Sequence, residues 1–266
     1  MTLLKFISCF AFGCFLNSCI LSGIPSPFVA SSYEPVVVKK KKEVQGSVGL
    51  RPFNYGYGDL TYAIGNSLAI RLSGGGFIGL GNLSGSFLYY KTLPKINYFA
   101  GAFYNFQSNQ MQRSFGYNLG EEFMSYRYSC VYNSPGIVFG LTLKGEEKVS
   151  HHFIFKSQYN IVSSYNYSFE NSDRYKYFKN EQLGYPLPDF LSFEPSYSSV
   201  IKSGNKNYFK IQAGFHFTQK TLRHHYVYDK NPQYGSAPVW SEATTLHPVS
   251  FPINISISYI FYSKKD

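Results

Sequence analysis

Apolar and polar residues alternate with a period of two along most of the chain from residue 43 onward. The last such run places apolar residues at every second position from Ile253 to Phe261, with Asn254, Ser256 and Ser258 between them. This alternation is typical of β-strands whose two faces lie in different surroundings. The polar face carries charged and amide side chains, so we expect it to face water or a polar interior.

The alternation, interrupted by turn residues, predicts about ten strands. Their approximate ranges are 43–51, 57–65, 67–77, 83–92, 96–106, 125–143, 148–162, 189–201, 206–218 and 248–262. The sixth is long, and its apolar residues change from even positions such as Tyr132 to odd positions such as Ile137. A β-bulge at residues 133–136, around Pro135, would explain this change.

The predicted connections alternate in length. Those after the second, fourth, sixth and eighth strands are short, whereas 107–124, 163–188 and 219–247 are long. An even number of strands with short turns at one end and long loops at the other is typical of outer-membrane barrels. We therefore expect an all-β fold, an antiparallel up-and-down transmembrane β-barrel over residues 43–262, followed by a tail at 263–266. A soluble lipocalin-like barrel or sandwich, with its apolar faces turned inward, is the alternative.

The N-terminus has the pattern of a processing signal. Residues 1–18 combine Lys5 with a short apolar stretch, which predicts a secretory signal peptide. Leu16-Asn17-Ser18-Cys19 resembles the bacterial lipobox, which implies cleavage before Cys19 and a lipid on its thiol. An ordinary signal peptide cut elsewhere is the alternative. Residues 19–42 would then be a lipid-anchored tether, and the absence of an acidic cluster after Cys19 favours an anchor on the periplasmic side.

The tether ends in a run of four lysines, Lys39 to Lys42. Such a run could contact anionic headgroups, or it could be the solvated end of a linker. Four cysteines are present, and Cys9 and Cys14 would leave with the signal peptide. A lipidated Cys19 leaves Cys130 alone, whereas an unmodified Cys19 could form a disulfide with Cys130.

Composition narrows the class of protein. Charged residues make up 15% and aromatic residues 19% of the chain, which excludes a disordered chain and disfavours a helical bundle. No apolar run reaches about 18 residues, so no transmembrane helix is expected. Lys and Arg exceed Asp and Glu by 25 − 15 = 10. For a protein outside the cytoplasm this basic charge favours lipopolysaccharide over nucleic acid as a partner.

Three parts of the sequence carry a family resemblance. They are Cys19 with its tether and the segment Glu43 to Leu50, the hairpin from Tyr62 to Ile70, and the segment from Phe193-Glu194-Pro195 to Phe217. In the spacing and pattern of their residues they resemble the uncharacterised outer-membrane β-barrel lipoproteins of Bacteroidota. The resemblance implies residence in the outer membrane and supplies no activity. Separately, Tyr259-Ile260-Phe261-Tyr262 resembles the aromatic terminal strand that the barrel-assembly machinery reads, so this machinery is an expected partner.

The inward faces of the predicted strands hold charged residues. They are Arg51, Asp59, Arg71, Lys156, Glu194 and Lys210. Such a set could form ion pairs that fill the lumen of a ten-stranded barrel, or it could line a narrow path that favours anions.

Evidence for catalysis or metal binding is weak. His151 and His152 would point to opposite faces of a strand and could not share one metal ion. His216 with Ser196 or Ser198 is a conceivable catalytic pair, but no enzyme motif surrounds it. We therefore expect no enzyme activity, no metal and no cofactor other than the lipid on Cys19.

The long loops are the remaining candidate for function. Aromatic, polar and basic residues of this kind favour recognition of partners or glycans, although a Tyr-rich loop could simply pack over the barrel mouth. The candidate recognition residues are Tyr175, Tyr177, Tyr185, His224, His225 and Trp240. The sequence therefore favours a non-enzymatic, lipid-anchored barrel with a structural or surface-recognition role. Its long loops would be extracellular, and its other partners would be outer-membrane lipid and lipopolysaccharide. A narrow-pore transporter is the second hypothesis, and a lipid-acting barrel enzyme is the third.

Overall fold

The computed structural model describes most of the predicted barrel and six residues of the predicted tether. The described residues are 33, 36, 38, 40–51, 55–77, 80–117, 122–144, 149–173, 176–182, 189–203, 207–218, 222–230, 240–246 and 253–263. The barrel strands are β1 (Val44–Arg51), β2 (Tyr55–Ala63), β3 (Leu68–Phe77), β4 (Leu80–Thr92), β5 (Ile96–Tyr117), β6 (Glu122–Lys144), β7 (Val149–Asp173), β9 (Phe190–Lys202), β10 (Asn207–Phe215) and β14 (Ile253–Ser263). No helix among the described residues has the length and apolar character needed to cross a bilayer.

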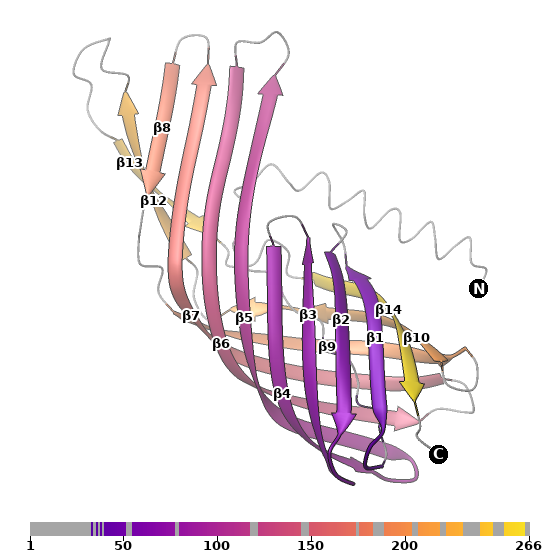
Figure 1. Ribbon diagram of the computed structural model, residues 1–266. Helices are drawn as coiled ribbons and strands as arrows, with labels where there is room; N and C mark the ends of the chain where they lie inside the picture. Colours follow the sequence, from indigo (N-terminus) through magenta and orange to yellow (C-terminus); the bar gives the residue numbers. More distant parts are fainter. Residues whose placement is uncertain are drawn as a thin grey trace.

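These strands form a closed antiparallel barrel (Figure 1). Consecutive strands from β1 to β7 pair with one another, β7 pairs with β9, β9 with β10, and β10 with β14. Val44 to Leu50 of β1 pair with Ser263 to Ile257 of β14, which closes the ring. The prediction of an up-and-down barrel of 10 strands is confirmed.

The barrel is apolar outside and polar inside. Leu72 is 59% exposed on the outer wall, whereas its neighbour Arg71 is 1% exposed. On β7, Phe153 and Phe155 likewise face outward, while His152 and Lys156 are buried. An apolar wall around a polar interior is stable in lipid and unfavourable in water. The structure is therefore that of a transmembrane barrel, and the soluble alternative with inward apolar faces is excluded.

Tight connections define one end of the barrel, which we call the short-turn end. Gly65 N–H donates to Leu68 O at 3.1 Å between β2 and β3, and Leu93 N–H donates to Ile96 O at 2.9 Å between β4 and β5. Between β9 and β10, Ser203 N–H donates to Asn207 O at 2.9 Å. Strand β1 begins at this end and the last strand, β14, finishes there. Val44, the first residue of β1, pairs with Ser263, the last residue of β14.

The other end differs from the sequence prediction, because the segments predicted as loops contain strands. Asn109 is the last β5 residue paired with β4, yet β5 and β6 stay paired up to Tyr117 and Glu122. Three further strands, β8 (Lys176–Gln182), β12 (Leu222–Lys230) and β13 (Trp240–Leu246), continue this sheet. Residues 110–117, 122–129 and 165–173 with these three strands form what we call the sheet extension, which rises above one side of the barrel (Figure 1).

The predicted bulge at 133–136 of β6 is wrong. The inward face keeps to even numbers, with Cys130, Tyr132, Ser134, Val138, Gly140 and Thr142 buried and Gly136 half-buried. The register shifts elsewhere, between Val131 and Tyr132 against β7. The apparent change of face arose because Tyr132 is aromatic but points inward, where its ring meets that of Phe190 edge-on at 6.1 Å.

Candidate functional site

The lumen of the barrel gathers the charged residues singled out from the sequence. Asp59, Arg71, Lys156, Glu194 and Lys210 are all buried there. Arg51 is the last residue of β1, and its side chain lies outside the described set. The period-two pattern places these residues on one face of each strand, and closure of the barrel brings the faces together.

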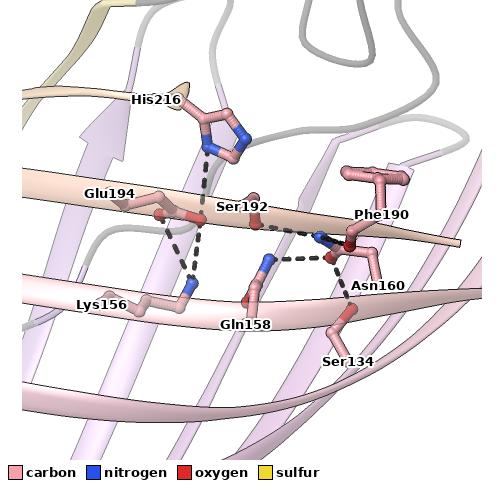
Figure 2. A network of polar contacts seen from close by, with 8 residues as sticks. All are labelled: Ser134, Lys156, Gln158, Asn160, Phe190, Ser192, Glu194 and His216. Carbon is pink, nitrogen blue, oxygen red and sulfur yellow. Dashed lines mark hydrogen bonds and ion pairs between the residues drawn. The ribbon is translucent and has the colours of Figure 1, made fainter. Parts of the chain in front are cut away.

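Glu194 is the centre of the first cluster in the lumen (Figure 2). It lies opposite Lys156 in the pairing of β9 with β7, and Lys156 Nζ donates to both carboxylate oxygens at 3.3 and 3.4 Å. His216 Nδ1 lies 3.4 Å from Glu194 Oε1. Lys156 Nζ also lies 5.1 Å from the ring centroid of Phe103 on β5. One carboxylate thus joins three strand regions, β7, β9 and the junction after β10.

Asn160 is the centre of the second cluster (Figure 2). Its Oδ1 accepts from Ser134 Oγ at 2.8 Å and from Gln158 Nε2 at 3.0 Å. Its Nδ2 donates to Ser192 Oγ at 2.9 Å and to Phe190 O at 3.2 Å. The sequence did not reveal this cluster, because serine and amide side chains are common on every polar strand face and nothing in their spacing marks Asn160.

Other polar groups pair around the rest of the wall. Arg71 Nε donates to Thr61 Oγ1 at 2.8 Å, and Lys210 Nζ donates to Gln212 Oε1 at 2.7 Å. Ser47 Oγ donates to Asp59 Oδ2 at 3.3 Å. Buried charges are stable only when they are paired in this way. Each of these charged residues therefore has a neutral polar partner, on the neighbouring strand for Arg71 and Asp59 and on the same strand for Lys210.

Three residues that precede β1 also lie in the lumen, which the sequence did not indicate. Tyr33, Val36 and Val38 are buried in a cluster with inward-facing residues of the barrel, including Phe99 and Phe103. The Tyr33 ring stacks on that of Phe99, with centroids 6.0 Å apart and planes 15° apart. These three residues belong to the stretch predicted as a tether, so at these positions the predicted tether lies in the barrel interior.

Lys40 to Glu43 redirect the chain from the lumen into the wall. Lys40 N–H donates to Glu43 Oε2 at 2.9 Å, and Lys42 N–H donates to Ala63 O at 2.8 Å at the short-turn end. Lys42 adopts a left-handed backbone with φ of 69°. The side chains of Lys40, Lys41 and Lys42 are exposed at this rim.

The histidines of β7 lie on opposite faces of the strand. His152 is buried and hydrogen-bonded to Thr142 Oγ1 at 2.7 Å and to Ser150 Oγ at 2.8 Å. His151 lies on the outer face, stacked on Tyr197. Within the part of the chain that the structure describes, no group of three or more His, Cys, Asp or Glu residues could hold a metal ion.

The conceivable serine–histidine pair is not assembled as such. His216 approaches Glu194, whereas Ser196 Oγ donates to Ile154 O at 3.5 Å. Cys130 is buried and carries a free thiol. Cys19 lies outside the described residues.

The predicted recognition residues are distributed over the sheet extension. Tyr177 is in β8, His224 and His225 are in β12, and Trp240 is in β13. Tyr228 pairs with Trp240, so β12 and β13 form a hairpin. Tyr175 and Tyr185 lie outside the described residues. The described members thus occupy strands, although the sequence had predicted loops.

Among known proteins the chain has distant structural neighbours and no detectable match in sequence. No family model matches the sequence, and no curated protein is detectably similar to it. Among solved structures, the outer membrane protease OmpT from Escherichia coli is similar with a TM-score of 0.38 and 10% identity, over 83% of this chain and 90% of that one. The Ralstonia pickettii toluene transporter TbuX is similar with a TM-score of 0.31 and 11% identity, over 84% and 90% of the two chains. A Pseudomonas aeruginosa FadL homologue has a TM-score of 0.26 and 7% identity, over 82% and 89%.

Proposed function

We propose that this protein is a lipid-anchored barrel of the bacterial outer membrane that recognises a ligand at the cell surface through its sheet extension. The observation that carries the proposal is the continuous pairing of β5, β6 and β7 beyond the barrel into β8, β12 and β13. A paired sheet presents its side chains in a fixed arrangement, which lowers the entropic cost of binding.

The residues of this sheet suit a glycan or another polar partner. Residues 163–188 combine seven aromatic residues with Asn, Asp, Arg and Lys. Aromatic rings provide large contact areas at a small conformational cost, and amide and charged groups pair with hydroxyls and phosphates. We take the polysaccharide of lipopolysaccharide as the first probe, because it is abundant at this surface and anionic where the chain is basic.

The binding test uses the full chain in lipid nanodiscs and immobilised polysaccharide from bacterial lipopolysaccharide. The wild-type protein is expected to bind, and a variant with residues 222–246 replaced by a short Gly-Ser linker is expected to lose binding. Tyr177→Ala should weaken binding, whereas Tyr89→Ala, on the exposed outer wall of β4, should not. Equal binding by the wild type and the truncated variant would overturn the proposed role.

The anchor is tested by metabolic labelling with radioactive palmitate. The lipobox-like sequence at Leu16 to Cys19 supports a lipid on Cys19. The wild type should take up label and Cys19→Ala should not. Label retained in Cys19→Ala would show that the lipid is attached at another residue.

A second function, transport of a small solute, is favoured by the polar lining of the lumen around Glu194, Lys156 and Asn160. Conductance through the purified barrel separates the two functions, since recognition by the sheet extension requires no open path.

A further inference from the structure

We propose that Tyr33, Val36 and Val38 form a plug that closes the lumen, and that Arg71, Phe99 and Phe103 form a cradle for the Tyr33 ring that would also accept a free phenolic compound. The inference concerns the passage through the barrel and goes beyond the role proposed for the sheet extension.

The barrel has room for such a plug. Side chains alone just fill the interior of an eight-stranded barrel, and this barrel has 10 strands. Two inward-facing glycines on β6 enlarge the interior further. A Cβ on Gly140 would collide with the ring of Phe99, and a Cβ on Gly136 would collide with the ring of Phe103. Both rings therefore lie close against the wall, and the space in front of them is taken by Tyr33.

The cradle binds Tyr33 through its ring. The ring centroid of Tyr33 lies 6.0 Å from that of Phe99 and 6.4 Å from that of Phe103. The guanidinium carbon of Arg71 lies over the same ring, 4.5 Å from its centroid. Cation–π contacts are strongest where both groups are removed from water, and Tyr33 and Arg71 are both buried. The electron-rich phenol ring of tyrosine suits this position.

The cradle is held in place by the wall. Arg71 Nε donates to Thr61 Oγ1 at 2.8 Å, and Phe99 and Phe103 are both on β5. The cradle therefore stays assembled when Tyr33 is removed, which makes it a site for a ligand of the same shape and not only a contact of the native segment.

The turn at Lys40 to Glu43 keeps the plug beside its site. Lys42 N–H donates to Ala63 O at 2.8 Å, and Ala63 N–H donates to Glu43 O at 2.9 Å. A segment tethered this closely has a high effective concentration at the lumen, so it returns after displacement. The plug thus behaves as an intramolecular ligand of the barrel.

The test measures ion conductance of the full chain in planar lipid bilayers. The wild type should be closed and Tyr33→Ala should conduct. Tyr89→Ala, at an exposed position of the outer wall, is the matched control and should remain closed. Addition of p-cresol, the side-chain analogue of tyrosine, should close the Tyr33→Ala channel again. Cyclohexanol, which has no π face, should leave it open.

Several outcomes overturn the proposal. A conducting wild type shows that Tyr33, Val36 and Val38 do not close the lumen. A closed Tyr33→Ala variant with the gel mobility of the folded barrel assigns closure to the wall side chains instead. Failure of p-cresol to block an open variant removes the cradle as a binding site. If Tyr33→Ala does not fold, Phe99→Leu, which weakens the cradle from the wall side, is measured instead. A Phe99→Leu variant that folds and does not conduct would then overturn the proposal. Polysaccharide binding is measured separately, and a failure there leaves this test unchanged.

Discussion

Removal of Glu194 gives a quantitative test of the lumen network. The carboxylate lies 3.3 Å from Lys156 Nζ and 3.4 Å from His216 Nδ1, and side-chain exposure is 7% for Glu194 and 3% for Lys156. Glu194→Leu leaves the Lys156 ammonium buried without its carboxylate. Breaking a buried ion pair from one side typically costs about 3–5 kcal/mol. The contact of Lys156 with the Phe103 ring lowers this cost, so we expect the free energy of unfolding to fall by about 3 kcal/mol.

Glu194 and Lys156 should also be energetically coupled. Lys156→Met should also destabilise the barrel, but the double variant should recover much of the loss, with a coupling free energy of about 2 kcal/mol. Stability is read from the fraction of protein that keeps folded gel mobility, unboiled, across a urea series in lipid vesicles. Lys210→Met is the matched control. Lys210 pairs with Val200, six residues along β9 from Glu194, and is therefore about 20 Å away.

The control decides how the result is interpreted. Lys210→Met combined with Glu194→Leu should be additive, because residues separated by more than about 10 Å rarely couple. Additive behaviour of Lys156→Met with Glu194→Leu, to within about 0.5 kcal/mol, would refute the claim that the pair contributes to stability.

Three further substitutions test other features of the barrel, each read by the same urea series. Leu72→Arg places a charge on the lipid-facing wall and should lower the free energy of unfolding by about 2–4 kcal/mol. The control Leu93→Arg, in the turn at the barrel end, should lower it by less than about 1 kcal/mol, and equal losses would contradict a lipid-facing wall. Gly140→Ala forces the aromatic ring beside it to move and should cost about 1–3 kcal/mol, whereas Gly81→Ala, with open space around it, should be neutral. Asn160→Leu leaves several buried hydrogen-bonding groups without their partner and should cost about 1–3 kcal/mol; an unchanged midpoint would show that water replaces the amide.

The barrel was predictable because each wall strand separates an apolar face from a polar one. Arg71 and Leu72 differ so strongly in chemistry that their opposite surroundings follow from the alternation alone. The same rule identified the charged residues of the lumen, since parity along a strand assigns a face. It could not rank Asn160 above other amides, because a hydrogen-bonding centre depends on which strands become neighbours.

The sheet extension could not be predicted in the same way. Tyr165, Tyr167 and Phe169 do alternate with polar residues, but this run is short and residues 163–164 and 171–173 on either side of it are all polar. The local pattern therefore fits a Tyr-rich loop as well as it fits a strand. Pairing there follows from continuation of β6 and β7 beyond the barrel, not from local pattern. The burial of Tyr33, Val36 and Val38 was hidden for a related reason. Their partners are distant in sequence, and a proline-containing segment of this kind looks like a linker.

The contacts of Tyr33 also determine when the plug can form during assembly. Its partners Arg71 and Phe103 are separated from it by 71 − 33 = 38 and 103 − 33 = 70 residues, whereas the seam between Val44 and Ser263 joins residues 263 − 44 = 219 apart. Contacts over short separations form before those over long ones. Tyr33 can therefore dock on the sheet from β1 to β5 while the barrel is still open, and the later strands then close around it. Conductance should accordingly be absent from the first moment that the barrel is complete.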